Sequence, residues 1–113
     1  MAGRYAELLE GSSLAVPDVP EGRSSVWAQY SLLARDTAHR SRAQDALKEQ
    51  GIPTAVYYPK PLHLQRAFAY LKYREGDFPV SEDCSQRIFS IPMHPYLARE
   101  DQEKVAKVMA EVI

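Results

Sequence analysis

The residues best suited to contact a ligand lie between positions 57 and 65, where aromatic and basic side chains alternate with proline. Pro59 and Pro61 fix the φ angle at two positions and bias the residue before each of them toward extended geometry. The backbone of this proline-rich segment (residues 57–65) therefore has little freedom left to lose on binding. We expect it to present four polar side chains, Tyr57, Tyr58, Lys60 and His63.

The two adjacent tyrosines lie at the end of a predicted strand. Residues 54–58 are rich in β-branched and aromatic types, which favour extended backbone. Successive side chains of a strand point to opposite faces, so at most one of Tyr57 and Tyr58 joins the core easily. The other must face solvent or a partner. A tyrosine exposed without any function is the alternative interpretation.

Other reactive residue types form no constellation that could do chemistry. His39, His63 and His94 are far apart, with no cysteine or carboxylate at ligand spacing, so the sequence predicts no metal site. Cys84 has no paired base and is expected to be a small buried hydrophobic residue. The five glycines are isolated and form neither a P-loop nor a dinucleotide fingerprint. We predict no catalytic residue in this chain.

Composition is typical of one compact domain, residues 1–113. The chain has 113 residues, 45% hydrophobic content and a formal net charge of -1, which argues against disorder and against nucleic-acid binding driven by positive charge. No run of apolar residues is long enough to span a membrane, and no signal segment is recognisable. A soluble, cytoplasmic protein is the expectation, and a single cysteine is compatible with a reducing compartment.

Hydrophobic periodicity predicts five helices and three extended segments. The predicted helices cover residues 3–10, 37–50, 64–71, 81–89 and 100–112, and the extended segments cover 24–34, 54–58 and 90–93. Asp36 or Thr37 is expected to cap the second helix, Gly51 to end it, and Ser81 to cap the fourth. The order predicts an α+β fold with a small two- to three-stranded sheet packed with helices, whose strands could pair parallel or antiparallel.

Two sets of apolar residues are predicted to be buried. Trp27 and Tyr30 lie in the predicted strand 24–34. This segment has apolar residues on both faces and is interpreted as a central strand. The second set lies on one face of each of three predicted helices, namely Ala43, Ala46, Leu47, Gln50, Cys84, Ile88, Phe89, Val105, Val108, Met109 and Val112.

Three blocks of sequence carry a resemblance to a known family. Residues 19–30, 51–65 and 91–97 occur in the same order as in the carboxy-terminal domain of the DegT/StrS-type sugar aminotransferases, which are pyridoxal-phosphate enzymes of fold-type I. The resemblance extends over nearly the whole chain. Members of that family are much longer, so it implies a C-terminal small domain whose large, cofactor-binding domain is absent here.

The resemblance also implies a role for the proline-rich segment. In such enzymes the matching loop borders an active site at a homodimer interface, close to the nucleotide-sugar substrate and the neighbouring subunit's cofactor. It implies substrate-binding roles for Tyr57, Tyr58 and His63, with Tyr58 the strongest candidate, although His63 could serve only in packing. A large-domain lysine would hold pyridoxal phosphate in the full-length enzyme, and we expect none to be bound by this fragment alone.

Two positions depart from the family pattern, and one alternative function stays open. Arg66 stands where family members often have proline, and Ala98 stands where a serine commonly caps the last helix. The first affects local loop shape and substrate choice, and the second should cost about 1 kcal/mol of helix stability. The alternative is a free-standing, non-enzymatic interaction module with the same fold.

Overall fold

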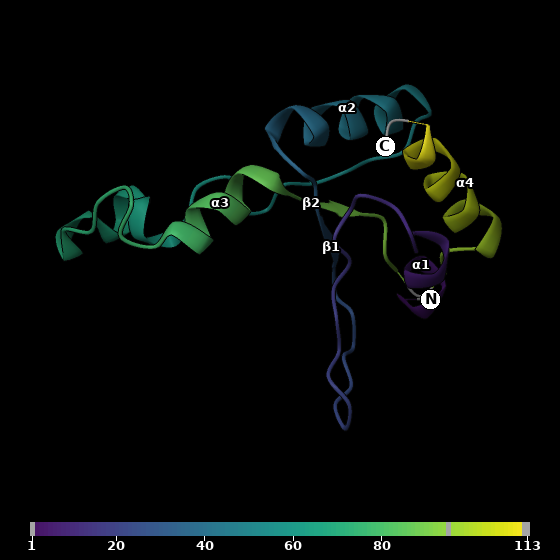
Figure 1. Ribbon diagram of the computed structural model, residues 1–113, viewed down its shortest axis with the longest axis horizontal. Helices are drawn as coiled ribbons and strands as arrows, with labels where there is room; N and C mark the ends of the chain where they lie inside the picture. The colour runs from purple at the N-terminus through teal and green to yellow at the C-terminus, as the bar shows by residue number, and fades with distance from the viewer. Residues whose placement is uncertain (1, 95, 112–113) are drawn as a thin grey trace.

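A two-stranded antiparallel sheet forms the centre of the protein (Figure 1). The computed structural model describes residues 2–94 and 96–111. Strand β1 (Tyr30–Leu33) pairs with β2 (Ile88–Ile91), so that Tyr30 lies opposite Ile91 and Leu33 opposite Ile88. Three helices surround this sheet, namely α1 (Ala2–Leu8), α2 (Thr37–Glu49) and α4 (Arg99–Ala110). The predicted α+β fold is confirmed. The pairing that was left open, between the predicted strands 24–34 and 54–58, does not occur among the described residues, because β1 and Ala55 both pair antiparallel with β2 instead.

Two isolated bridges widen the sheet on both sides. Ala15 exchanges two backbone hydrogen bonds of 3.0 Å with Leu33, on the side of β1 away from β2. Ala55 pairs in the same way with Ser90, through bonds of 3.1 and 2.8 Å. The prediction of a strand over residues 54–58 was therefore wrong in extent, because Ala55 alone of these five pairs with the backbone of another described residue.

The core lies between one face of the sheet and the three helices. Tyr30 and Leu32 of β1 face the same side as Phe89 and Ile91 of β2, as the two-residue period of a strand requires. The helices cover this face with buried side chains, among them Tyr5, Ala43, Leu47, Val105, Val108 and Met109. The predicted inward residues of the last helix are thereby confirmed, except Val112, which lies outside the described residues.

Helix α2 begins and ends as the sequence predicts. The Asp36 carboxylate accepts a hydrogen bond of 2.7 Å from the backbone N–H of His39, which makes Asp36 the N-cap. Gly51 follows the helix with a φ of 73°, in the left-handed region that favours glycine. These local signals fix the direction in which the chain leaves α2 toward the proline-rich segment.

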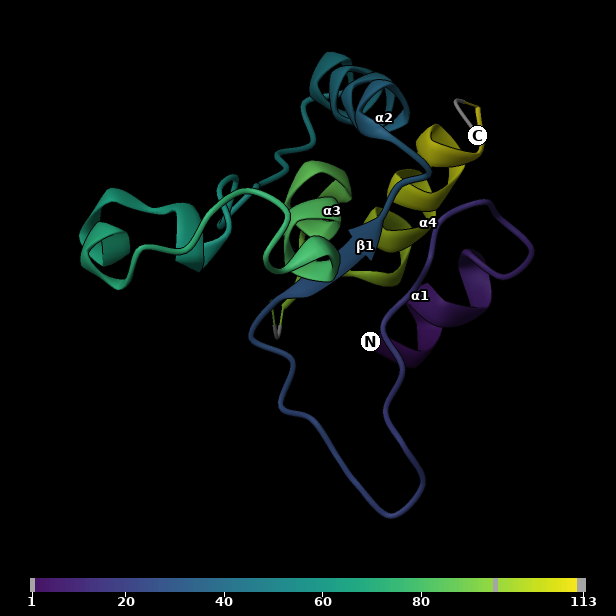
Figure 2. The same cartoon turned by 60° about the vertical axis from the view of Figure 1, so that its left-hand side comes forward.

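Residues 24–29 do not extend β1, contrary to the prediction of a strand over 24–34. They belong to a long loop, residues 16–29, that projects from the body of the protein (Figure 2). Val26 is 99% exposed and Trp27 has a φ of 54°, which no strand residue adopts. Alternating hydrophobicity alone does not make a strand when no neighbouring segment offers hydrogen bonds. Trp27 is nevertheless partly buried, with its ring 5.3 Å from that of Tyr30.

The helix predicted over 81–89 is displaced toward the N-terminus. Helix α3 (Pro79–Arg87) has Phe78 as its N-cap and proline at its start, so Ser81 is not the cap. Ile88 and Phe89 leave the helix and form the beginning of β2. Cys84 is partly buried in α3. The helical prediction failed for Ile88 and Phe89 because their hydrophobic pattern is compatible with a strand as well as with a helix. Their pairing with β1 makes them a strand.

Residues 59–80, here called the arm, project away from the sheet beyond the N-terminal end of α3 and include its first two residues (Figure 1). The arm contains two 3-10 helices, η1 (Leu62–Leu64) and η2 (Arg66–Leu71), where one helix over 64–71 was predicted. Gln65 separates them with extended backbone, and Lys72 ends η2 in the left-handed conformation. In the described part of the chain, no helix is both long and apolar enough to cross a bilayer.

Candidate functional site

The proline-rich segment starts at the sheet edge and leads into the arm. Its first residues follow Ala55, whose backbone is held by Ser90. Tyr57 and Tyr58 are 54% and 64% exposed, so neither joins the core. Both rings line a small cavity of about 60 Å³ beside the sheet, and Tyr57 also lines a cleft of about 300 Å³ that reaches Met93 and His94. The sheet therefore presents the two tyrosines together at an open surface.

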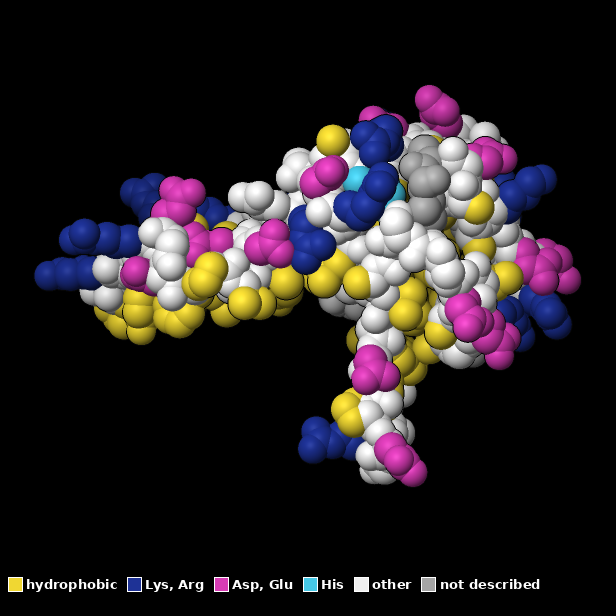
Figure 3. Space-filling model, viewed as in Figure 1, with side chains coloured by type: hydrophobic (Ala, Val, Ile, Leu, Met, Phe, Trp, Pro, Cys, Tyr) yellow, Lys and Arg dark blue, Asp and Glu magenta, His cyan; other side chains and the backbone are white. Residues whose placement is uncertain are grey.

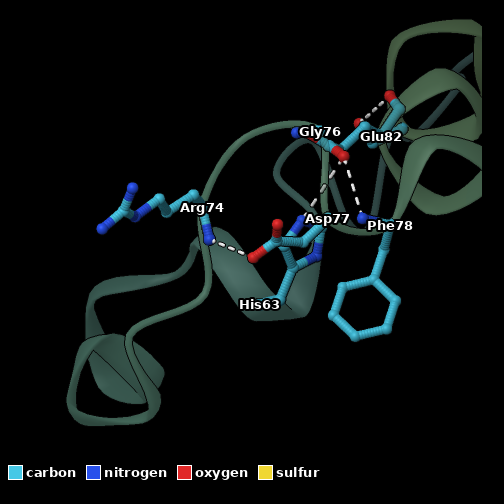
Figure 4. Close-up of polar contacts among 7 residues, drawn as sticks. His63, Arg74, Gly76, Asp77, Phe78 and Glu82 are labelled. Atoms are coloured by element: carbon cyan, nitrogen blue, oxygen red, sulfur yellow. Dashed lines mark hydrogen bonds and ion pairs between the residues drawn. The ribbon is translucent and has the colours of Figure 1, made fainter.

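His63 lies apart from the tyrosines, inside the arm. Its side chain is 7% exposed, and Nε2 lies 3.6 Å from an Oε of Glu82 (Figure 4). The His63 ring meets the ring of Phe78 edge-on at 4.8 Å, and the ring of Tyr73 lies 6.4 Å away. The structure does not place His63 in either cavity that the tyrosines line. These contacts are those of a packing residue, and substrate binding by His63 stays a prediction.

Glu82 ties together the turn that joins the arm to α3. Its two carboxylate oxygens accept hydrogen bonds from the backbone N–H groups of Gly76, at 2.7 Å, and Phe78, at 3.2 Å. The neighbouring Asp77 accepts a bond of 2.7 Å from the backbone N–H of Arg74 (Figure 4). The Glu82 carboxylate thus holds the turn that precedes α3, and it faces His63 at the same time.

The arm also carries exposed apolar surface. Hydrophobic side chains form a continuous band along its lower side (Figure 3). The large exposed residues of the arm include Leu62, Tyr70 and Val80. A cavity of about 310 Å³ opens among Leu62, His63, Phe68, Leu71, Tyr73, Phe78 and Ser81. Apolar patches of this kind usually mark an interaction surface.

The fold and the exposed segment agree with one family. The family model for the DegT/DnrJ/EryC1/StrS aminotransferase family matches residues 1–110. The chain therefore belongs to the DegT/DnrJ/EryC1/StrS aminotransferase family.

Relatives and solved structures support that assignment. The chain is 43% identical over 113 residues to a pleiotropic regulatory protein of Geobacillus stearothermophilus, and 37% identical over 114 residues to a UDP-N-acetyl-3-dehydro-α-D-glucosamine 3-aminotransferase of Acidithiobacillus ferrooxidans. A DegT/DnrJ/EryC1/StrS aminotransferase from Brucella abortus superposes on 97% of the chain with a TM-score of 0.86 and 43% identity. NtdA from Bacillus subtilis, with bound cofactor PMP, superposes on 98% of the chain with a TM-score of 0.79 and 25% identity.

The alignments cover nearly all of this chain but only a small part of each relative. The alignments include 97% and 99% of this chain but only 30% and 29% of the two relatives. The two solved structures show the same imbalance, with 28% and 26% of their chains matched. The chain thus spans less than a third of the length of the proteins that it resembles.

The lysines of this chain do not fit a role in holding pyridoxal phosphate. None of the five lines any of the three cavities described above. Lys48, Lys60, Lys72 and Lys107 are exposed, and Lys104 donates to the backbone oxygen of Gln50 at 3.4 Å. Among the described residues, no three histidine, cysteine or acidic side chains gather as a metal site would require.

Sequence reasoning missed three residues at the sheet edge. Gln29, Ser31 and Ser90 line the cavities beside Tyr57, although none was a candidate. Gln29 and Ser31 were visible as the polar positions that alternate with Tyr30 and Leu32. Their position next to Ser90 depends on the pairing of β1 with β2, which no local pattern reveals.

Proposed function

We propose that this chain is the C-terminal domain of a pyridoxal-phosphate-dependent aminotransferase that acts on a nucleotide-linked keto sugar. In this proposal the domain shapes the substrate site and the homodimer interface, and it has no activity alone. The observation that carries the proposal is the match of nearly the whole chain to less than a third of each aminotransferase relative. The remainder of such a polypeptide would supply the cofactor lysine, because no lysine here is suitably placed.

The exposed surfaces are the second support. Tyr57 and Tyr58 are held at an open cleft, and the arm presents an apolar band that a domain of this size rarely leaves in water. Contact with a large domain or a second subunit would bury that band. The substrate class follows the name of the Acidithiobacillus ferrooxidans relative, which acts on a UDP-linked dehydro sugar.

The alternative is a free-standing interaction module with the same fold. One observation favours it, because the relative from Geobacillus stearothermophilus is described as a regulatory protein. The two functions require different native polypeptides. An enzyme needs the chain within a polypeptide about three times as long, since this chain matches 29% of the Acidithiobacillus ferrooxidans aminotransferase.

The mass of the native protein in its source cells tests the proposal. We expect peptides of this chain to be recovered from a polypeptide much heavier than 12.8 kDa, together with peptides that contain a cofactor-binding lysine. A native species of about 12.8 kDa as the sole form would contradict the enzyme proposal and favour the interaction module.

A further inference from the structure

The arm and helix α3 are held together by polar and aromatic contacts. Glu82 of α3 holds the turn at Gly76 and Phe78, and the rings of His63 and Tyr73 pack beside Phe78. Among residues 2–94 and 96–111, the hydrogen bonds, ion pairs and ring contacts of the arm all stay within it or reach α3. The hydrophobic core of the described chain includes no arm residue. The arm and α3 therefore form one structural unit.

Helix α3 has little packing of its own against the body of the protein. Of its nine residues, all of them described, Ser85 alone is buried, and Val80 is 76% exposed. In most protein helices a buried apolar face fixes the orientation. The orientation of α3 must depend instead on the bonds at its C-terminal end, where it continues into β2 beneath α2 (Figure 1).

Arg40 of α2 spans this junction between helix and strand. Its Nη1 donates hydrogen bonds to the backbone oxygens of Ser85, at 3.0 Å, and Ile88, at 3.3 Å. Ser85 lies in the last turn of α3 and Ile88 is the first residue of β2, so one guanidinium nitrogen bonds both sides of the junction. The last carbonyl oxygens of a helix have no partner within the helix, and a cation there also complements the helix dipole.

Arg87 supplies a second attachment at the same place. Its side chain donates a bond of 2.8 Å to the backbone oxygen of Ala34, and its own backbone oxygen accepts a bond of 3.0 Å from the N–H of Ala34. Asp83 holds the Arg87 side chain through an ion pair of 2.9 Å. These bonds fasten the last residue of α3 to one residue after β1. They do not bridge α3 to β2, as the bonds of Arg40 do.

We propose that Arg40 is the positioning residue that fixes the angle between α3 and β2, and with it the place of the arm beside Tyr57 and Tyr58. In the described part of the chain no carboxylate pairs with Arg40, and its buried Nε has no hydrogen-bond partner. Both of its bonds go to main-chain oxygens, so they hold the backbone itself. Without them the arm and α3 would pivot together about the junction and displace the exposed apolar band.

A distance measurement between two spin labels tests the inference. Cys84→Ser removes the native thiol, and nitroxide labels are attached at Tyr70→Cys in the arm and Glu100→Cys in α4, both exposed positions. A second pair, Lys48→Cys in α2 with Glu100→Cys, reports on the body alone. With Arg40 in place, we expect a single narrow distance distribution for each pair from double electron–electron resonance.

Matched variants of α2 separate the two possibilities. In Arg40→Met we expect the arm-to-body distribution to broaden or to move to a new mean, while the pair within the body stays unchanged. Arg42→Met, at an exposed position of the same helix, is the control and should change neither pair. An unchanged arm distance in Arg40→Met, or equal changes in Arg40→Met and Arg42→Met, would overturn the inference.

Arg40→Lys keeps a cation and its donors but has a shorter reach. We expect its arm distribution to lie between those of the original chain and Arg40→Met. If Arg40→Met does not fold, Arg40→Lys decides, since an arm distribution as narrow as that of the original chain, or one that broadens together with the pair within the body, would contradict the proposed role. No substrate or cofactor enters the measurement, so its outcome is independent of the native-mass test of the proposed function.

Discussion

The hydroxyl of Tyr5 donates a hydrogen bond of 2.7 Å to the backbone carbonyl oxygen of Pro92. The bond joins α1 to the segment that directly follows β2, and the Tyr5 ring lies 5.0 Å from that of Tyr30 in the core. Burial, followed by the nearby Asp101 and Tyr30, raises the pKa of Tyr5 to about 12. The hydroxyl therefore remains a donor throughout the neutral range, and α1 is held to the same segment that forms the cleft.

Replacement of Tyr5 by phenylalanine should weaken this link. Tyr5→Phe removes the donor and leaves the Pro92 carbonyl without its partner, so we expect the free energy of unfolding to fall by about 1 kcal/mol. Urea denaturation followed by circular dichroism measures the change. Tyr96→Phe, at an exposed position, serves as the control and should be neutral. Equal stability of the Tyr5→Phe variant and the original chain would show that the hydrogen bond contributes nothing.

The stability of the fold should depend on His39. This residue is fully buried, its Nδ1 accepts a hydrogen bond of 3.0 Å from the backbone N–H of Arg35, and its Nε2 has no partner among the described residues. Burial, reinforced by Arg35 and Arg42, lowers the pKa of His39 below its ordinary value of 6.5. As pH falls below 6.5, the unfolded chain takes up a proton before the folded one does, so the free energy of unfolding decreases.

Denaturation at pH 7.5 and pH 5.5 measures this dependence. We expect lower stability at pH 5.5, and we expect His39→Leu to remove much of the difference while His94→Gln retains it. Two results would contradict the claim that burial keeps His39 neutral in the folded protein. One is an NMR titration that places the pKa of His39 at or above 6.5, and the other is a chain that is more stable at pH 5.5 than at pH 7.5.

Helix α4 lacks a side-chain cap, and adding one should stabilise the protein. Ala98 is the N-cap residue, with extended backbone and no side-chain hydrogen bond. Ala98→Ser supplies an acceptor for the N–H groups of the first turn, which should raise the free energy of unfolding by about 1 kcal/mol. Ala110→Ser, at the other end of the helix, is the matched control and should give no gain. If the melting temperature of Ala98→Ser does not increase, the serine side chain at this position does not cap the first turn of α4.

Much of the fold was predictable because several signals are local. Asp36 and Gly51 fix the ends of α2 through their own side-chain and backbone chemistry, and the spacing of Val105, Val108 and Met109 fixes the buried face of α4. Strand extent was not predictable, because a strand exists only where another segment pairs with it. Val26 and Trp27 have the same alternating pattern as Tyr30 and Leu32, but no other segment of the described chain pairs with them.

The candidate site was predictable only in part, for the same reason. Proline content identified the segment with Tyr57 and Tyr58, which the structure does expose. His63 is equally polar in sequence, yet the packing of Phe78 and Glu82 places it inside the arm. The proximity of Ser31 to Ser90 follows from the register of two strands 59 positions apart, which no local signal encodes.

The role of Tyr58 can be tested in a hybrid enzyme, in which this chain replaces the matching segment of the Acidithiobacillus ferrooxidans relative. If the Tyr58 hydroxyl bonds the substrate or orders the cofactor region, Tyr58→Phe should lower kcat/KM by roughly 1 to 2 kcal/mol in transition-state terms. Folding should hardly change because the side chain is exposed. Tyr70→Phe is the control and should be nearly silent. If Tyr58→Phe leaves the kinetics unchanged while Tyr70→Phe impairs them, Tyr58 has no part in the substrate site.

Amino transfer by the same hybrid enzyme tests the proposed function most directly. The measurement is the rate at which the hybrid converts the UDP-linked keto sugar of the Acidithiobacillus ferrooxidans relative to the amino sugar, with this chain alone assayed in parallel. We expect a folded hybrid that contains the cofactor and turns over, and no turnover by the chain alone. A hybrid that folds and retains the cofactor but lacks activity, or turnover by the isolated chain, would contradict the account.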